Sequence, residues 1–222
     1  MIVASRKPLE EILDALETAE KILVAGCGTC VSVCMAGGEK EAGLLATEIR
    51  MALKLRGRDV SVTTATVQRQ CETEFVETLA PEAADRDIIV SIGCGAGVQF
   101  IAQHFQNIRV IPGLNTEFIG VVKEPGQFAE YCGACGDCVL HLTGGICPIA
   151  RCSKSLLNGP CGGSSGGFCE IGNDVACAWQ LIYDKLKAAG RLDLMTLINA
   201  PKNWKTNRDG GPRRAERKEQ KS

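Results

Sequence analysis

Cysteine is the residue that most constrains how this chain can fold, because 13 of its 222 residues are cysteines. A small secreted protein with this content would be built around disulfides. Here the count is odd, and the N-terminal stretch MIVASRKPLEEILDALETAEK carries acidic residues where a signal peptide requires an apolar core. Cysteines two residues apart in a chain without an export signal usually bind metal or carry out redox chemistry. We therefore expect a cytoplasmic protein whose cysteines bind metal or iron–sulfur clusters.

Residues 1–125 alternate between short apolar segments and amphipathic segments, which is typical of an α/β domain. Strands are expected at residues 21–26, 59–67, 87–93 and 109–114. Helices are expected at residues 8–19, 34–57, 71–80 and 97–105, with Leu44 among the inward-facing residues of the second. The predicted fold is a small parallel sheet with helices on both faces and right-handed crossovers.

Residues 126–201 form a second region of different composition, an irregular cysteine- and glycine-rich module followed by helices. Its irregular part has too little apolar material to fold unaided, so bound metal is expected to supply part of its stability. A helix is expected over residues 174–190, with Val175 and Trp179 on its apolar stripe, and a shorter one over residues 192–200.

A basic tail, residues 202–222, is expected to be disordered. It contains eight Lys and Arg residues against three acidic ones, a net charge of +5, while the whole chain has −1. Such a segment could bind an acidic surface of a partner through ionic contacts.

Two segments share one unusual pattern, VAGCGTCVSVC at residues 24–34 and VSIGCGAGVQF at residues 90–100. Each is predicted to be a buried strand, a Gly-Cys-Gly turn and a helix. Glycine-rich turns of this kind can bind a nucleotide phosphate. The dinucleotide fingerprint fails here, because Val31 replaces its third glycine and Thr63 and Thr64 stand where an acidic residue would bind the ribose.

Cluster binding explains these segments better. The carboxyl ends of parallel strands share one edge of a sheet, so cysteines that follow different strands can converge there. Four thiolates usually hold a [4Fe–4S] cluster. Glycines in the turns would leave backbone N–H groups free to hydrogen-bond the cluster sulfides. The alternative is that some of these cysteines are small buried apolar residues, as Cys34 or Cys71 could be singly. We expect four ligands from Cys27, Cys30, Cys34, Cys71 and Cys94.

The second region contains the remaining eight cysteines, Cys132, Cys135, Cys138, Cys147, Cys152, Cys161, Cys169 and Cys177. The first three have the Cys-x2-Cys-x2-Cys spacing of a bacterial ferredoxin. The Cys-Pro pair that follows comes later than in a ferredoxin, so this is not a ferredoxin domain. Eight thiols could hold two four-thiolate sites, or one site with spare cysteines. A [4Fe–4S] cluster is expected here, with a four-cysteine zinc site as the alternative, and spacing alone does not select the ligands.

Other functional classes find little support in the sequence. The two histidines, His104 and His141, belong to no recognisable acid–base set, and no catalytic residue is predicted. The body of the chain is acidic and aromatic residues make up 5 %, which argues against nucleic-acid binding. No run of 18 apolar residues could span a membrane. Many potential cluster ligands and few acid–base groups favour electron transfer.

Long segments of the chain resemble a known family. The segment YCGACGDCVLHLTGGICPIARCSKSLLNGPCGGSSGGFCEI and the later DVACAWQLIYDKL are similar to the methylenetetrahydrofolate reductase C-terminal family. The segments GCGTCVSVCMAGGEKE, QRQCETEF and SIGCGAGVQF resemble the small cysteine-rich subunit, of the MetV type, of the acetogen reductase. The resemblance covers nearly the whole chain.

The resemblance implies a cytoplasmic iron–sulfur subunit of one-carbon metabolism in the Wood–Ljungdahl pathway. It implies [4Fe–4S] clusters, two in our reading, and a partner, the flavin-bearing catalytic subunit that reduces methylenetetrahydrofolate. FMN is expected on that partner only, and a further electron-input subunit is a second expected partner. Descriptions of the family also mention zinc. Three hypotheses about the function remain open: an electron-transfer subunit, a zinc-binding scaffold of the same complex, and a stand-alone thiol or cluster enzyme.

Overall fold

The computed structural model describes residues 1–215 and divides the chain into two compact units, Met1–Ala129 and Glu130–Ser222. The boundary lies close to the one expected from the change in composition after residue 125. The fold class is confirmed: a parallel four-stranded sheet with helices is joined by further small sheets. Among the described residues, no helix is long and apolar enough to cross a membrane.

The first unit is built on a parallel sheet with the strand order β3-β2-β4-β5. Its strands are β2 (Lys21–Cys27), β3 (Ser61–Val67), β4 (Ile88–Ser91) and β5 (Arg109–Pro112). Its helices are α1 (Leu9–Ala15), α2 (Cys30–Val33), α3 (Glu39–Leu55), α4 (Thr73–Glu77), α5 (Ala80–Ala83) and α6 (Gly95–His104). The chain runs from β2 outward to β3 and then returns to β4 on the other side of β2. This reversal creates a topological switch point between β2 and β4.

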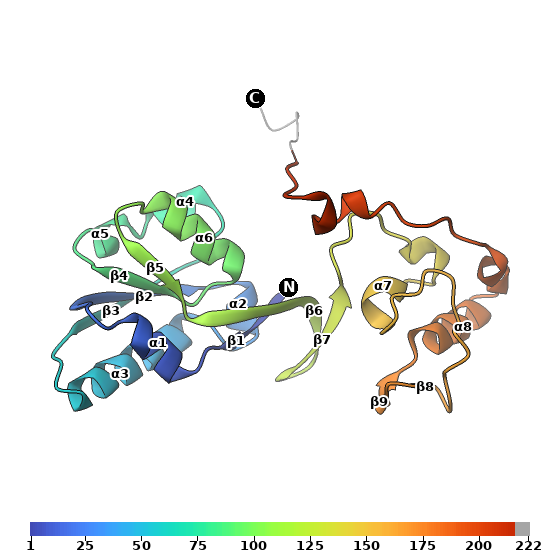
Figure 1. Cartoon of the computed structure of the whole chain (residues 1–222), viewed down its shortest axis with the longest axis horizontal. Coiled ribbons are helices and arrows are strands. Elements are labelled where there is room, and N and C mark those ends of the chain that lie inside the picture. The colour runs from blue at the N-terminus through green and yellow to red at the C-terminus, as the bar shows by residue number, and fades with distance from the viewer. Residues whose placement is uncertain (216–222) are drawn as a thin grey trace. The chain divides into compact units, whose positions relative to one another are not determined.

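Both faces of the parallel sheet are covered, as the sequence predicted. In Figure 1, α1 and α3 lie on one side of the sheet, and α4, α5 and α6 lie on the other. Successive residues of β2 face opposite sides of the sheet. Ile22 and Val24 pack in the core under α1 and α3. Leu23 and Ala25 pack in the core under α4, α5 and α6. Apolar residues on both faces explain why β2 and β4 are continuous apolar runs.

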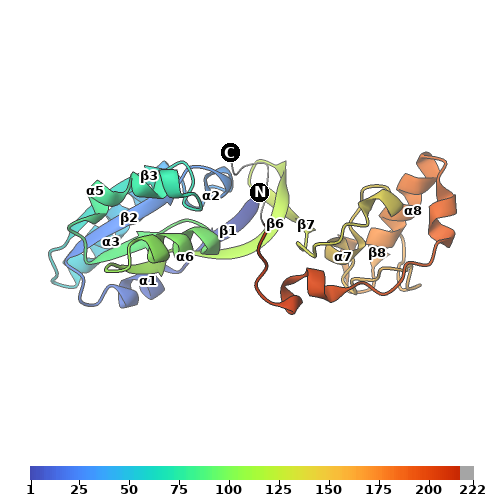
Figure 2. The same cartoon turned by 90° about the horizontal axis from the view of Figure 1, so that it is seen from above.

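A second sheet, whose last strand continues into the first residues of the second unit, was not expected from the sequence. It has the order β1-β6-β7, with β1 (Ile2–Arg6), β6 (Leu114–Glu124) and β7 (Gln127–Cys132). Strands β1 and β6 are antiparallel and lie side by side in Figure 1 and in Figure 2. Val3 and Ala4 of β1 join the α1–α3 core, so this sheet is part of the packing of the first unit.

The predicted helix over residues 34–57 begins later than expected. The chain forms the short α2, passes Met35 with a positive φ of 56°, and begins α3 at Glu39. A Cβ at Gly37 would lie 1.9 Å from the carbonyl oxygen of Ile92, so the backbone passes too close to β4 for a side chain there. Leu44 was expected to face inward but is 51 % exposed, because Leu45 and Ile49 occupy the buried face.

The second unit has little regular structure. It contains α7 (Pro148–Arg151), β8 (Phe168–Cys169), β9 (Gly172–Ala176) and α8 (Ala178–Ala188), with single 3-10 turns at Leu140–Leu142, Leu192–Thr196, Trp204–Thr206 and Arg208–Gly210. Its buried core consists of Cys177, Trp179, Ile182 and Leu186. Val175 lies in β9 and not on the helix, because α8 begins only after Cys177. The shorter predicted helix is the 3-10 turn at Leu192–Thr196.

Candidate metal centres

Three cysteines of the first group follow three different strands at the carboxyl edge of the parallel sheet. Cys27 is the last residue of β2, Cys71 lies between β3 and α4, and Cys94 is the N-cap residue of α6 just after β4. Cys27 and Cys94 flank the switch point between β2 and β4, where open α/β sheets bind their ligands.

The electrostatics of Cys71 are influenced by the other two thiols of this edge. Burial raises the pKa of the Cys71 thiol, and charge repulsion from Cys94 and then Cys27 raises it further. Like charges at one place oppose ionisation. A metal ion would relieve this repulsion, because metal binding displaces thiol protons. The sulfur of Cys27 also lies 3.8 Å from Thr29 Oγ1 and 3.9 Å from Gln68 O.

The other two cysteines of the first group differ from each other. Cys30 is the first residue of α2 and is partly accessible. Cys34 is 8 % exposed, and its thiol donates to Val31 O at 3.4 Å and to Ala4 O at 3.6 Å. Cys34 therefore packs between α2 and β1 inside the α1–α3 core, the role of a small buried residue.

Gln70 is a buried residue of this edge that the sequence reasoning missed. Its amide nitrogen donates to Ala25 O at 2.9 Å and Gly26 O at 3.1 Å, and its amide oxygen accepts from Ser91 Oγ at 2.7 Å. It is 1 % exposed and directly precedes Cys71. Gln70 thus connects the ends of β2 and β4 to the loop after β3. The only indication of this role in the sequence is that Gln70, a polar residue, directly precedes the candidate ligand Cys71.

The glycines of the two turns have a different role from the one predicted. We expected their N–H groups to be free for cluster sulfides. Instead, Gly28 N donates to Val67 O at 2.9 Å, Gly93 N to Ser91 Oγ at 3.3 Å and Gly95 N to Thr116 Oγ1 at 2.8 Å. For these three the prediction is wrong. A Cβ at Gly93 would lie 2.0 Å from the Gln70 amide oxygen, so this glycine is required by close packing.

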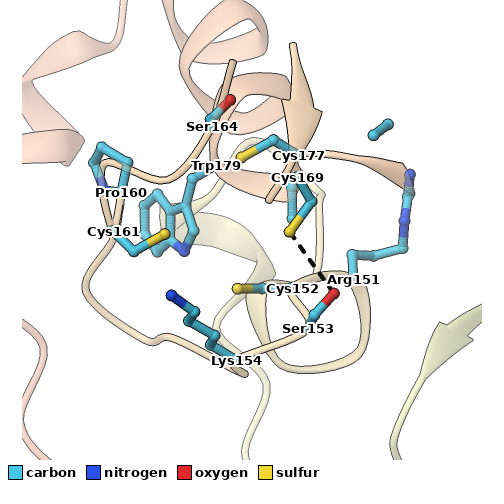
Figure 3. Close-up of a pocket in the computed structure, with 12 residues that line it drawn as sticks. Arg151, Cys152, Ser153, Lys154, Pro160, Cys161, Ser164, Cys169, Cys177 and Trp179 are labelled. Atoms are coloured by element: carbon cyan, nitrogen blue, oxygen red, sulfur yellow. Dashed lines mark hydrogen bonds between the residues drawn. The ribbon is translucent and has the colours of Figure 1, made fainter. Parts of the chain in front are cut away.

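The eight cysteines of the second unit divide into two sets of four, each lining its own cavity. The first set, named the knuckle set here, is Cys132, Cys135, Cys138 and Cys147. The second, named the helix set, is Cys152, Cys161, Cys169 and Cys177. Figure 3 shows the four sulfurs of the helix set directed toward the space between them, with Trp179 and Lys154 at its border. Sequence spacing did not reveal this division, because the helix set has no Cys-x2-Cys pair.

Backbone N–H groups point at the sulfurs of both sets. Ala134 N donates to Cys132 Sγ, Ala150 N to Cys147 Sγ and Gly163 N to Cys161 Sγ, each at 3.4 Å. Hydrogen bonds to a ligand sulfur influence the properties of a bound metal. The donor chemistry of both sets therefore suits a thiolate-bound metal centre.

In the helix set, the first backbone N–H groups of α8 and the ammonium of Lys154 also interact with the thiols. Burial raises the pKa of the Cys177 thiol, but hydrogen bonds from Gln180 N, Ser164 and Trp179 N outweigh burial and lower the pKa overall. These backbone donors are the first N–H groups of α8, for which Cys177 is the N-cap residue. The pKa of Lys154 is raised by its hydrogen bond to Glu170 and, against desolvation, by the charges of Cys161 and Cys169.

Within residues 1–215, no three or more His, Cys, Asp or Glu side chains lie close enough together to hold one metal ion as they stand.

Comparison with known proteins relates the C-terminal part of the chain to one family. Residues 111–205 match the family model described as "Methylene-tetrahydrofolate reductase C terminal". The matched region includes all eight cysteines of the second unit, whereas the five of the first unit lie outside it. No curated protein and no solved structure matches the chain. Over residues 111–205, which are less than half of the chain, the sequence is similar to the methylenetetrahydrofolate reductase C-terminal family.

Proposed function

We propose that this chain is the electron-transfer subunit of a methylenetetrahydrofolate reductase complex of the Wood–Ljungdahl type, a subunit of the MetV kind. In this proposal [4Fe–4S] clusters pass electrons to a flavin-bearing catalytic partner, which carries FMN. The observation that carries it is the placement of the cysteines: three follow three strand ends at one sheet edge, and eight more line two cavities in sets of four. The family match supports the link to the reductase.

The first cluster would be held by Cys27, Cys30, Cys71 and Cys94. Three of these follow β2, β3 and β4 at the carboxyl edge of the parallel sheet. Cys30 is assigned as the fourth because it begins the helix that follows Cys27 and is accessible, whereas the Cys34 thiol is used in the core. Gln70 fixes the strand ends that carry the ligands.

The second cluster would be held by the knuckle set, whose first three cysteines have ferredoxin spacing. The helix set is a further four-thiol site, and zinc is the alternative occupant there, since four-cysteine zinc sites stabilise small irregular folds.

A bound [4Fe–4S] cluster supplies a one-electron carrier whose reduction potential depends on surrounding charge, hydrogen bonds and solvent exposure. The chain provides these surroundings. Ala134 N and Ala150 N donate to the sulfurs of the knuckle set and stabilise negative charge on them. At the switch point, Gln70 and Ser91 hold the strand ends rigidly, which limits the movement of ligands between redox states.

The competing function is a zinc-binding scaffold of the same complex that carries no electrons. One observation favours it: the hydrophobic cluster of the second unit has four buried members among the described residues, so bound metal would add to the stability of this unit whatever its redox role. The two functions differ in whether electrons leave the chain.

Electron transfer to the partner can be measured directly. The anaerobically purified chain is reduced, freed of reductant and mixed in a stopped-flow instrument with the oxidised flavin-bearing subunit. We expect the flavin absorption to bleach while the EPR signal of the reduced clusters disappears. The Cys135→Ser variant should lose most of this transfer because it removes a ligand of the knuckle set. Cys34→Ala is the matched control and should transfer electrons as the wild type does.

A flavin that stays oxidised when mixed with a fully reduced, iron-loaded chain would contradict electron transfer to this partner. It would favour the scaffold function.

A further inference from the structure

The basic C-terminal segment lies against the loop that carries the knuckle set. Thr206 Oγ1 donates to Cys135 O at 2.8 Å, and Arg213 donates from Nη1 to Ala134 O at 2.9 Å. Lys202 Nζ donates to Asp137 O. Residues 202–213, named the strap here, therefore bind three carbonyl oxygens between Cys132 and Cys138. The sequence predicted disorder for the whole of 202–222, of which residues 216–222 lie outside the described part.

The loop under the strap has a backbone that needs outside support. Ala134 has a φ of 50°, which is unfavourable for a residue with a side chain, and Gly136 has a φ of 79°. Such conformations persist when the surroundings fix them. The strap also approaches very closely, because a Cβ at Gly136 would lie 2.2 Å from Thr206 O. The strap and the loop are therefore complementary in shape as well as in hydrogen bonding.

The strap also brings positive charge to the loop. The side chain of Lys202 is only 2 % exposed, and its ammonium lies 3.4 Å from Asp137 Oδ2. Asp137 directly precedes Cys138, so without Lys202 its carboxylate would add uncompensated negative charge next to the thiolates. Arg213 adds a second cation over Ala134 and also donates to Thr206 O at 2.9 Å, which holds the strap in its fold.

We propose that the strap is a positioning element of the knuckle-set metal centre, in which Thr206 and Arg213 hold the loop and Lys202 neutralises Asp137. This inference rests on the proposed function in one respect only, that the centre is redox-active. The reduced state of a thiolate-bound cluster carries one more negative charge than the oxidised state. Nearby cations stabilise the reduced state more than the oxidised one, and nearby anions do the opposite.

The charge balance is tested by an EPR-monitored redox titration of four variants. We expect Lys202→Met to lower the reduction potential of the knuckle-set cluster, because Asp137 is left unpaired. Asp137→Asn should raise it, and the double variant should return close to the wild-type value. The matched control is Lys205→Met, since Lys205 lies exposed in the same segment and its ammonium forms no hydrogen bond or ion pair that the described residues show. It should leave the potential unchanged.

The decisive outcome is the return of the reduction potential to the wild-type value when Asp137→Asn is added to Lys202→Met. A loss of packing at Lys202 would not be reversed by removing a carboxylate. Equal potentials in the wild type and Lys202→Met, with the cluster intact in both, would overturn the charge role.

The holding role is tested by the rate at which a chelator removes metal from the full chain. Thr206→Val deletes the hydroxyl that binds Cys135 O but keeps the size of the side chain, and it should speed metal loss about tenfold or more. Thr206→Ser retains the hydroxyl and should restore the wild-type rate. Equal rates for all three proteins would overturn the holding role. Because zinc release can be followed as well as iron release, this result is independent of whether the centre carries electrons.

Discussion

Cys94→Ala is expected to remove the N-terminal cluster completely and to lower the iron content by about four atoms per chain. Cys94 lies at the switch point beside Cys71 and Cys27, and a cluster with three protein ligands in an accessible turn is poorly retained. Cys27→Ala should have the same effect, although the two residues belong to separate strand-to-helix turns. Iron analysis and the EPR spectrum of the reduced protein measure the loss.

Cys34→Ala is the matched control in the same region. Its thiol is hydrogen-bonded to two carbonyl groups within the core, so its removal should cost about 1 kcal/mol of stability and leave the iron content unchanged. The C-terminal EPR signal should remain in all three variants. If Cys34→Ala lost the cluster and Cys30→Ala kept it, our choice of four ligands from the five would be incorrect. Full iron retention in Cys94→Ala would refute the shared site itself.

Gln70→Ala is expected to destabilise the first unit by about 3 kcal/mol. It removes the three hydrogen bonds of a fully buried amide and leaves Ala25 O, Gly26 O and the Ser91 hydroxyl with lost partners, beside a new cavity. Urea unfolding followed by far-UV circular dichroism measures the change. Both tryptophans, Trp179 and Trp204, belong to the second unit, so their fluorescence transition should move little.

Gln99→Ala provides the comparison for this substitution. Gln99 is exposed on α6 and, within the described part of the chain, its side chain donates only to Gly95 O of its own helix, so its loss should change the unfolding free energy by less than about 0.5 kcal/mol. Similar small effects for Gln70→Ala and Gln99→Ala would show that Gln70 does not connect the strand ends in solution.

The parallel sheet could be predicted from sequence because its signals are local. Apolar runs such as Ile88–Ser91 alternate with amphipathic helices, and this alternation is visible within short windows. The antiparallel sheet could not be predicted, because β1 pairs with β6 more than 100 residues later and β6 is largely exposed. Its register depends on tertiary contacts that no local pattern records.

For the first candidate site, the sequence predicted which strand ends carry the cysteines. It did not predict which of the five thiols are packed in the core or which other residues support the site. The rule that parallel strands end at one edge places Cys27, Cys71 and Cys94 after three strand ends of one sheet edge, which is where the structure has them. Which thiol is packed in the core depends on β1, whose pairing the sequence did not reveal, and so Cys34 could not be separated from the others. The same holds for Gln70, whose partners lie on two other strands.

In the second unit the sequence identified the cysteines but not their grouping. The two cavities are formed by turns whose spacing follows no repeated motif, and the strap contacts the loop across about seventy residues. Composition predicted disorder for the strap because charge and glycine dominate it. Its order comes from hydrogen bonds to the carbonyls of the cysteine loop, which composition cannot show.

The most direct test of the central claim is the metal content and redox spectrum of the full chain purified without oxygen. We predict a brown protein with about eight irons per chain, for two [4Fe–4S] clusters, and an EPR signal that develops on reduction. Zinc in the helix set would be compatible with that result. A colourless chain that contains only zinc and shows no redox-active signal would contradict the electron-transfer function.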